Sequence, residues 1–324
     1  MTREIITVLG PHRVYGSVKS VLNNIAERRG MATKDISPGS PGAISLYTGR
    51  KTIWHTPTNP SRENLYVTNS PLFSLEAWEI LAKGVPLMVY EEYFPRGRRK
   101  DSISKMLLKP FKNIPFICPT MRTHEFLLQT GIMSFAIPPA TRRIKQSRRR
   151  EHILFIGRAE ETKNPMFFFR LARLLKDEHF VFIGRGALSQ KLRAEAKGIR
   201  NLEYLDFVEK DEELTKYYSK AKLFVHTATS DPIAFVIVEA LSASVPVITS
   251  PGVGASDFLP ENWVIKDFLE SSWARKIREI TENQDASIEL ARQAYESNHL
   301  DIGDPYFKKI EGELELAISE QLGC

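Results

Sequence analysis

The chain has 324 residues, which is longer than a single hydrophobic core usually organises and suits two domains of about 150 residues each. Hydrophobic residues make up 42% of the chain and charged residues 26%, so the composition excludes a disordered or a membrane-spanning class. The net charge of +6 includes two basic clusters, residues 96–100 and 142–150, which are typical of contact with phosphates or anionic headgroups, or of a solvated linker.

Cysteine content and the first residues indicate a cytoplasmic protein. The two cysteines, Cys118 and Cys324, support neither a disulfide framework nor a thiolate metal site. The first ten residues resemble a core strand more than a signal peptide, and no apolar run approaches the roughly 18 residues that a spanning helix needs. We therefore expect a cytoplasmic protein whose basic clusters could hold it peripherally at an anionic membrane surface.

The first 140 residues predict alternating strands and helices. Strands are expected at 5–9, 43–47, 65–68, 86–90 and 115–118, and helices at 18–28, 72–83 and 121–130. A glycine-bearing turn through Gly16 follows the first strand. This alternation is typical of a Rossmann-like domain.

The second half alternates more clearly. Apolar strands are expected at 152–157, 179–184, 202–205, 222–227 and 245–249, with helices at 165–175, 188–196 and 211–219 and an apolar helix of about eleven residues after Asp231. Asn164 is expected to cap the first of these helices, with Pro165 in the first helical position. Continuous apolar strands separated by helices predict a parallel sheet covered on both faces.

The basic run at 142–150 lies between the halves and marks the expected domain junction. We expect an α/β fold of two facing Rossmann-like domains, residues 1–145 and 146–302, with the ligand crevice at the carboxyl ends of the strands. Residues 303–324 predict an amphipathic helix.

One acid within the apolar helix is the most informative residue of the chain. Glu239 follows Asp231 by eight positions, and nearly all of its neighbours are apolar. A carboxylate there is costly to bury unless it accepts hydrogen bonds, which favours a ligand, although a solvent-facing glutamate is the plainer alternative. Asp231 before Pro232 is also a good helix N-cap, and from helical geometry the two carboxylates can reach one side of a crevice.

This segment resembles the nucleotide-sugar-binding signature of retaining glycosyltransferases of family 4, which have the GT-B fold. The shared pattern is an acid, seven residues, Glu239-Ala240, a strand through Val245-Pro246-Val247 and a turn through Gly252-Val253-Gly254. The first acid is Asp where the family usually has Glu, and Ala234 occupies a place where Gly is common. In the family the last helix crosses back to the first domain.

The resemblance implies a donor site in the second half. Arg158 and Lys163, after the strand-ending Gly157, look like the cations that stabilise the departing diphosphate, Asp231 like the acid that holds donor-sugar hydroxyls, and Glu239 like the acid that accepts both ribose hydroxyls. Each of these residues also has a structural alternative. For Arg158 and Lys163 the alternative is that both are simply exposed loop residues.

Backbone groups complete the implied site. Gly184 leaves room for close ligand approach or simply forms a tight turn, and Phe207-Val208 either reads the nucleobase edge or packs on the core. Free N–H groups of Gly252, Val253 and Gly254 could hold phosphate oxygens.

Acceptor chemistry is open at this stage. Where the family often has a histidine after a strand, this chain has Glu91-Glu92, which could orient acceptor hydroxyls, act as a base or form a charged loop. The other candidates are His12, His55 and His124.

The expected activity is metal-independent transfer of a sugar from a UDP- or GDP-linked donor to a hydroxyl of a glycan, lipid-linked or protein acceptor, with retention at the anomeric carbon. No cofactor is expected, the donor being a substrate, and no metal-ligand cluster or nucleic-acid-binding aromatic platform occurs. The alternatives are a catalytically degenerate nucleotide-sugar-binding protein, or another GT-B enzyme such as an epimerase or a phosphorylase.

Overall fold

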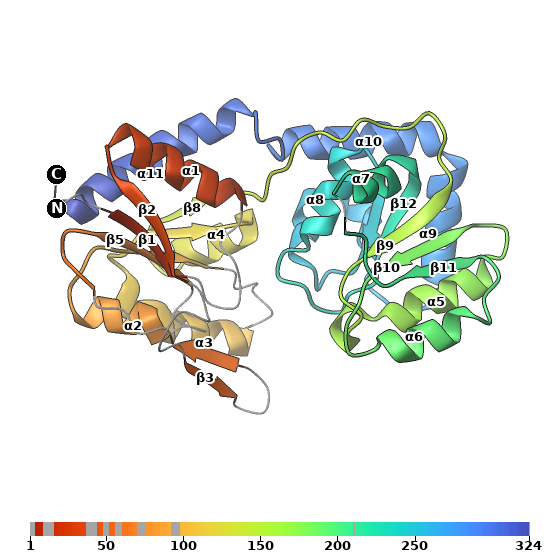
Figure 1. Cartoon of the computed structure of the whole chain (residues 1–324), viewed down its shortest axis with the longest axis horizontal. Coiled ribbons are helices and arrows are strands. Elements are labelled where there is room, and N and C mark those ends of the chain that lie inside the picture. Colours follow the sequence, from red (N-terminus) through yellow and green to blue (C-terminus); the bar gives the residue numbers. More distant parts are fainter. Residues whose placement is uncertain are drawn as a thin grey trace. The chain divides into compact units, whose positions relative to one another are not determined.

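The computed structural model describes residues 4–8, 16–36, 44–47, 52–55, 60–69, 75–91, 98–209 and 211–323. The chain divides into two compact units, the first made of Met1–Pro139 and Gly303–Cys324 and the second of Ala140–Ile302 (Figure 1). It leaves the first unit once and returns to it with its last helix. No helix within the described ranges combines the length and the apolar character needed to cross a membrane.

The first unit is built on a parallel sheet with the strand order β2-β1-β5-β6-β7-β8. These strands are β1 (Glu4–Val8), β2 (Ala32–Ile36), β5 (Leu65–Asn69), β6 (Leu87–Tyr90), β7 (Phe116–Cys118) and β8 (Ser134–Ala136). The sequence patterns predicted β1, β5, β6 and β7 but missed the two edge strands, since β2 is rich in polar residues and β8 has three residues. The predicted strand at 43–47 exists as β3 (Ile44–Tyr47), but it pairs with β4 (Thr52–His55) in a separate antiparallel hairpin.

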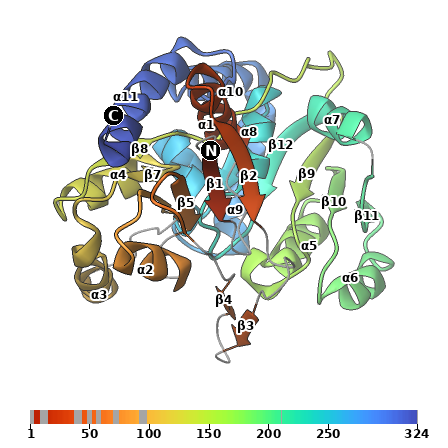
Figure 2. The same ribbon diagram turned by 60° about the vertical axis from the view of Figure 1, so that its left-hand side comes forward.

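Helices cover both faces of this sheet. Figures 1 and 2 show α1 (Gly16–Arg28) and α11 (Pro305–Leu322) on one face, and α2 (Leu75–Ala82) and α3 (Arg98–Leu108) on the other. Helix α4 (Met121–Leu128) contacts β7 and β8. The guanidinium of Arg28 on α1 forms ion pairs with Glu311 and, at 2.8 Å, with Glu315, which ties α11 to α1. The last helix therefore belongs to the first unit.

The second unit contains a parallel sheet with the order β11-β10-β9-β12-β13. Its strands are β9 (His152–Ile156), β10 (Phe180–Ile183), β11 (Leu202–Leu205), β12 (Ala221–His226) and β13 (Val247–Thr249). All five were predicted from the sequence. The order steps outward from β9 to β11 and then returns to the other side of β9, so β9 and β12 are neighbours at a topological switch point.

Helices cover both faces of the second sheet as well. Helix α5 (Pro165–Leu174) packs against α6 (Ser189–Ala196) and α9 (Glu270–Glu282), whereas α8 (Phe235–Ser242) packs against α10 (Gln284–Ser297). Helix α7 (Asp211–Lys220) leads into β12. Two short 3-10 segments, η3 (Gly254–Phe258) and η4 (Glu261–Trp263), follow β13.

Aromatic packing fixes the central strands beneath the ligand-facing loops. The ring of Phe155 on β9 stacks on Phe182 of β10 at 4.8 Å, and Phe168 on α5 meets Phe180 edge-on at 5.2 Å. All four rings are fully buried. Because such rings bury a large apolar area with defined geometry, they hold the ends of β9 and β10 in fixed positions.

The start of α8 differs from the prediction. Its first residue is Phe235, preceded by Ala234 in the left-handed conformation with a φ of 59°, so Asp231 is not the N-cap and Pro232 is not the first helical residue. The helix has 8 residues, fewer than predicted. Asp231 lies in the loop after β12, so the helical-geometry argument that placed it relative to Glu239 is wrong. Helix α5, by contrast, begins at Pro165 as predicted; Asn164 occupies the N-cap position, but its side chain makes no capping hydrogen bond.

Candidate functional site

The loops that follow β9 and β12 are bound to each other at the switch point. The backbone N–H of Thr229 donates to the carbonyl of Thr162 at 2.9 Å, and the hydroxyl of Thr227 donates to the carbonyls of Lys163 and Asn164, each at 3.0 Å. Ligands of open α/β sheets bind outside the carboxyl ends of strands at such a point. The described loops are thus locked in the place where a ligand is expected.

Asp231 is the centre of a charged cluster in these loops. One oxygen of its carboxylate, Oδ2, forms an ion pair with the ammonium of Lys163 and lies 3.1 Å from Nε2 of His226. The other, Oδ1, accepts a hydrogen bond of 3.2 Å from the backbone N–H of Ala234. The side chains of Lys163 and Asp231 are 10% and 15% exposed, so the pair is largely but not completely shielded from water.

The environment of Asp231 keeps its carboxylate ionised. Burial alone would raise the pKa of this carboxyl, but the hydrogen bond and charge of His226, together with those of Lys163, hold the pKa below its ordinary value. A carboxylate that stays charged is available as an acceptor for hydroxyl groups.

His226 is a site residue that the sequence patterns did not single out. Its side chain is 1% exposed and stacks between the rings of Phe155 at 5.6 Å and Phe224 at 6.2 Å. The carboxylate of Asp231 only accepts, so Nε2 donates in this hydrogen bond, while Nδ1 is buried with no hydrogen-bond partner among the described residues. The available signal was a histidine that ends a largely apolar strand five residues before Asp231.

The structure separates the two predicted diphosphate-binding cations. Lys163 is buried against Asp231, whereas the side chain of Arg158 is 68% exposed and its Nη1 donates to Glu160 at 2.9 Å. Arg158 nonetheless lies in the same β9 loop, immediately after Gly157. Its guanidinium is thus an exposed cation in the loop that also carries Lys163.

The glycines of these loops are required by contacts between neighbouring backbones. A Cβ atom on Gly184 would lie 1.8 Å from the carbonyl oxygen of Gly157, and one on Gly254 would lie 1.7 Å from that of Pro232. No side chain fits at such distances, so Gly184 is required by the close approach of the Gly157 carbonyl, a contact that tests neither the ligand-approach nor the tight-turn interpretation.

The prediction of free N–H donors in the turn after β13 is wrong for Val253 and Gly254. The N–H of Val253 donates to the carbonyl of Ser250 at 3.4 Å. The N–H of Gly254 donates to the backbone carbonyl of Asp231 at 2.8 Å. The carbonyl of Gly252 in turn accepts from the N–H of Asp231 at 3.1 Å. The Gly254 N–H and the Gly252 carbonyl therefore bind the backbone of Asp231 and help to position that residue.

Glu239 is not the solvent-facing residue of the plainer alternative. It is partly buried on α8, and its Oε2 accepts a 2.5 Å hydrogen bond from the hydroxyl of Tyr218 on α7, which is 2% exposed. Burial, opposed by the Tyr218 hydrogen bond and assisted by the charge of Asp211, raises the pKa of the Glu239 carboxyl. The hydroxyl of Tyr218 thus supplies one of the hydrogen bonds to Glu239 that the sequence pattern led us to expect from a ligand.

Phe207 and Val208 differ from each other in burial. Val208 packs against the core, which agrees with the structural alternative. The ring of Phe207 is 57% exposed, and the guanidinium of Arg185 lies 4.6 Å above it. An exposed aromatic–cation pair at the carboxyl end of β11 is compatible with stacking on a base.

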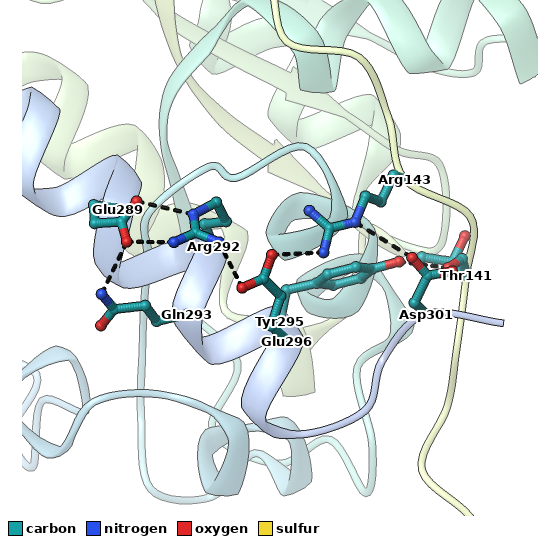
Figure 3. A network of polar contacts seen from close by, with 8 residues as sticks. All are labelled: Thr141, Arg143, Glu289, Arg292, Gln293, Tyr295, Glu296 and Asp301. Atoms are coloured by element: carbon teal, nitrogen blue, oxygen red, sulfur yellow. Dashed lines mark hydrogen bonds and ion pairs between the residues drawn. The ribbon is translucent and has the colours of Figure 1, made fainter. Parts of the chain in front are cut away.

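One residue of the second basic cluster, Arg143, has a structural role. Figure 3 shows Arg143 between Glu296 and Asp301, with Nη2 donating to Glu296 at 2.7 Å and Nε to Asp301 at 3.3 Å. Arg143 also lies 5.2 Å above the ring of Tyr295, whose hydroxyl donates to the carbonyl of Thr141 at 2.6 Å. These contacts fix the linker to the second unit, so the unit begins at Ala140 and not at the predicted 146.

The acceptor-side candidates are only partly described. Glu91 is fully buried at the end of β6, which contradicts the charged-loop interpretation for this residue. His124 is part-buried and its Nδ1 lies 2.9 Å from the hydroxyl of Ser134. Glu92 and His12 lie outside the described residues, and His55 is the last residue of β4. Within the described part of the chain, no group of three or more His, Cys, Asp or Glu residues is placed to hold a metal.

Comparisons with known proteins agree with this architecture. Residues 139–297 match the family model described as glycosyl transferases group 1. A curated relative from Campylobacter jejuni is 32% identical over 118 residues, which cover 34% of this chain. Its name is GalNAc-alpha-(1->4)-GalNAc-alpha-(1->3)-diNAcBac-PP-undecaprenol alpha-1,4-N-acetyl-D-galactosaminyltransferase. The match spans about a third of that relative, 32% of its length.

Solved structures of low identity share the fold. HepE from Anabaena, in complex with UDP and glucose, is 14% identical with a TM-score of 0.68, covering 98% of this chain and 99% of its own. Sucrose-phosphate synthase from Thermosynechococcus elongatus is 12% identical with a TM-score of 0.70 and 99% coverage of both chains. The pneumococcal O-GlcNAc transferase GtfA, in complex with UDP and GlcNAc, is 16% identical with a TM-score of 0.62, covering 82% of this chain and 58% of its own. Residues 139–297 therefore match the glycosyl transferases group 1 model, and the chain shares its GT-B fold with these solved structures.

Proposed function

We propose that the chain transfers a sugar from a nucleotide diphosphate donor to an acceptor hydroxyl, with retention at the anomeric carbon. The observation that carries this proposal is the cluster of Lys163, Asp231 and His226 at the β9/β12 switch point. It offers a cation for a diphosphate and an ionised carboxylate for sugar hydroxyls within one place. UDP is the favoured nucleotide, because HepE and GtfA were solved with UDP.

In this proposal the donor diphosphate takes Lys163 as its partner. Without a ligand the ammonium of Lys163 neutralises Asp231. An incoming diphosphate carries more negative charge than one carboxylate and competes for the same cation, and Arg158 adds a second positive charge from the exposed loop. Asp231 then accepts donor-sugar hydroxyls while His226 and the Ala234 N–H keep its oxygens in place.

Charge development explains why cations suffice at this site. As the bond between the anomeric carbon and the phosphate oxygen breaks, the electron pair leaves with the diphosphate, and Lys163 and Arg158 stabilise that charge without a metal. The acceptor oxygen bonds to the anomeric carbon and its proton leaves to a base or to the departing phosphate. Glu239 remains the proposed acceptor for the ribose hydroxyls, through Oε1 and beside the Tyr218 hydroxyl. Retention requires either attack on the face that the leaving group vacates or two successive inversions.

The acceptor is proposed to be a glycan or a lipid-linked glycan. The Campylobacter jejuni relative carries undecaprenol in its name, which supports a lipid-linked acceptor and peripheral contact of this chain with a membrane.

Turnover tests the proposal directly. The protein is incubated with UDP-glucose, UDP-N-acetylgalactosamine or GDP-mannose and a panel of hydroxyl acceptors, and nucleotide release and product anomeric configuration are measured. We expect release and a retained configuration with one donor, loss of both in Lys163→Met, and normal activity in Lys197→Met, a control at an exposed lysine. Nucleotide binding without sugar release would overturn the transferase assignment and leave a binding protein.

A further inference from the structure

The outer face of α3 exposes a row of large apolar side chains. Ile103, Met106 and Leu107 are 52%, 66% and 38% exposed. Their i, i+3, i+4 spacing places them on one stripe of the helix. The core of the first unit takes a different stripe, Ser104 and Leu108, so α3 has a second apolar face that no described part of this unit covers.

Lysines form a separate row beside this face. Lys105 on α3, Lys109 in the 3-10 segment η1 (Lys109–Phe111) that continues it, and Lys112 just after η1 recur at i, i+4 and i+7, and all three are exposed. Residues 102–113 contain no aspartate or glutamate. The exposed surface of residues 102–113 is therefore apolar on one side and carries lysines as its only charged residues on the other.

The charge and the shape of this exposed surface together indicate which class of partner it fits. A groove for another protein's side chain would need walls, whereas this surface is the convex side of one helix. Apolar residues on one exposed stripe with lysines beside them are the composition of a helix that lies in the interface of a bilayer. Anionic headgroups complement the three lysines, since each basic residue near such a surface strengthens binding roughly fivefold.

We propose that α3 with η1 is a membrane-docking face for anionic phospholipid. Ile103, Met106 and Leu107 enter the boundary between headgroups and acyl chains, and the ammonium groups of Lys109 and Lys112 contact phosphates. Lys105 is held 5.6 Å from the ring centre of Phe126 and orients the row toward α4. The inference rests on the proposed function in one respect. A lipid-linked acceptor lies in a membrane, so docking there brings the chain to its acceptor.

Sedimentation with vesicles tests the proposal without donor or acceptor. We expect the protein to pellet with phosphatidylglycerol-containing vesicles and to remain in solution with pure phosphatidylcholine. The variant Lys109→Gln/Lys112→Gln should bind about thirtyfold more weakly, and Ile103→Ser/Met106→Ser about tenfold more weakly. All four side chains are exposed, so thermal unfolding should be unchanged.

Helix α11 supplies matched controls, because it lies on the opposite face of the same sheet (Figures 1 and 2). Lys308→Gln/Lys309→Gln removes two exposed lysines, and Leu316→Ser removes a leucine that is 69% exposed. Equal vesicle binding by the α3 variants and these controls would overturn the proposal. So would binding to polyglutamate in place of vesicles, which would indicate an acidic protein partner. Nucleotide binding, measured separately, stays normal in all four variants if only the docking assignment fails.

Discussion

At the scale of single residues, the position of Asp231 depends on three partners that belong to different parts of the second unit. Lys163 comes from the β9 loop, His226 from the end of β12, and the Ala234 N–H from the residue before α8. A carboxylate with both oxygens engaged has little freedom to rotate. This preorganisation is what a donor-sugar contact requires.

His226 acts in this account as a positioning residue. In His226→Leu the Nε2–H donor is lost while the site stays apolar, so Asp231 Oδ2 keeps only Lys163. We expect kcat to fall about tenfold or more, because a hydrogen bond to a charged group is removed, while the donor KM changes less. His226→Gln places an amide N–H near the former Nε2 and should recover most of the rate. Equal losses in the two variants would show that packing alone is at work.

Glu239 and Asp231 have opposite effects on stability. The pKa of Glu239 is raised in the fold, so its charged form is disfavoured near neutral pH, and Glu239→Gln should raise the melting temperature at pH 7. This gain should vanish as the pH falls below the ordinary value of 4.5, where the glutamate is itself protonated. The pKa of Asp231 is lowered, so Asp231→Asn should lower the melting temperature, with the deficit shrinking only as the pH falls below 3.8.

Melting temperatures of the natural protein and both variants between pH 3 and pH 8 check these signs. The account fails if Glu239→Gln destabilises the fold at pH 7. That result would mean that the Tyr218 hydrogen bond to the charged carboxylate outweighs its burial.

At the scale of elements, the beginning of α8 is set by backbone conformation. Ala234 adopts a φ of 59°, a region that costs a residue with a side chain about 1–2 kcal/mol and costs glycine little. The turn is stabilised by the Asp231 carboxylate, which accepts from the Ala234 N–H. This explains in physical terms why a glycine is common at this place in the resembling family.

Two alanine-to-glycine variants separate this conformational effect from burial. Ala240→Gly, inside α8 at a fully buried position, should cost about 2 kcal/mol, from helix propensity and the lost methyl group. Ala234→Gly loses a similar methyl group but relieves the left-handed strain, so we expect a change within about 0.5 kcal/mol. Denaturant unfolding of the pair checks the difference. Equal costs would contradict the strain at Ala234.

The strands of the second unit were predictable because they are largely apolar, whereas the helices α9 and α10 were not predicted. The 3-residue β8 and the polar edge strand β2 gave no such pattern, and the β3–β4 hairpin depends on pairing that composition does not specify. The start of α8 was mispredicted because Asp231-Pro232 carries a strong helix-start signal, whereas the contact of Asp231 with Lys163 and His226 arises only in the folded chain.

At the scale of the whole molecule, the two-unit organisation follows from long-range contacts that local patterns reveal only in part. Residues 140–145 look like a basic linker, yet Arg143 binds Glu296 and Asp301 and makes them part of the second unit (Figure 3). Lys163, Asp231 and Glu239 were predicted as site residues from motifs in the sequence. Their partners His226 and Tyr218 come from β12 and α7, where only the fold brings them to those acids.

Calorimetric titration of UDP into the protein tests the central claim, that a nucleoside diphosphate binds at the carboxyl ends of β9 and β12. We expect saturable binding by the natural protein and by Lys197→Met, and affinity reduced at least about tenfold in Lys163→Met, because that variant loses a charged contact to phosphate. Binding of UDP by Lys163→Met as tight as that of the natural protein would contradict the account.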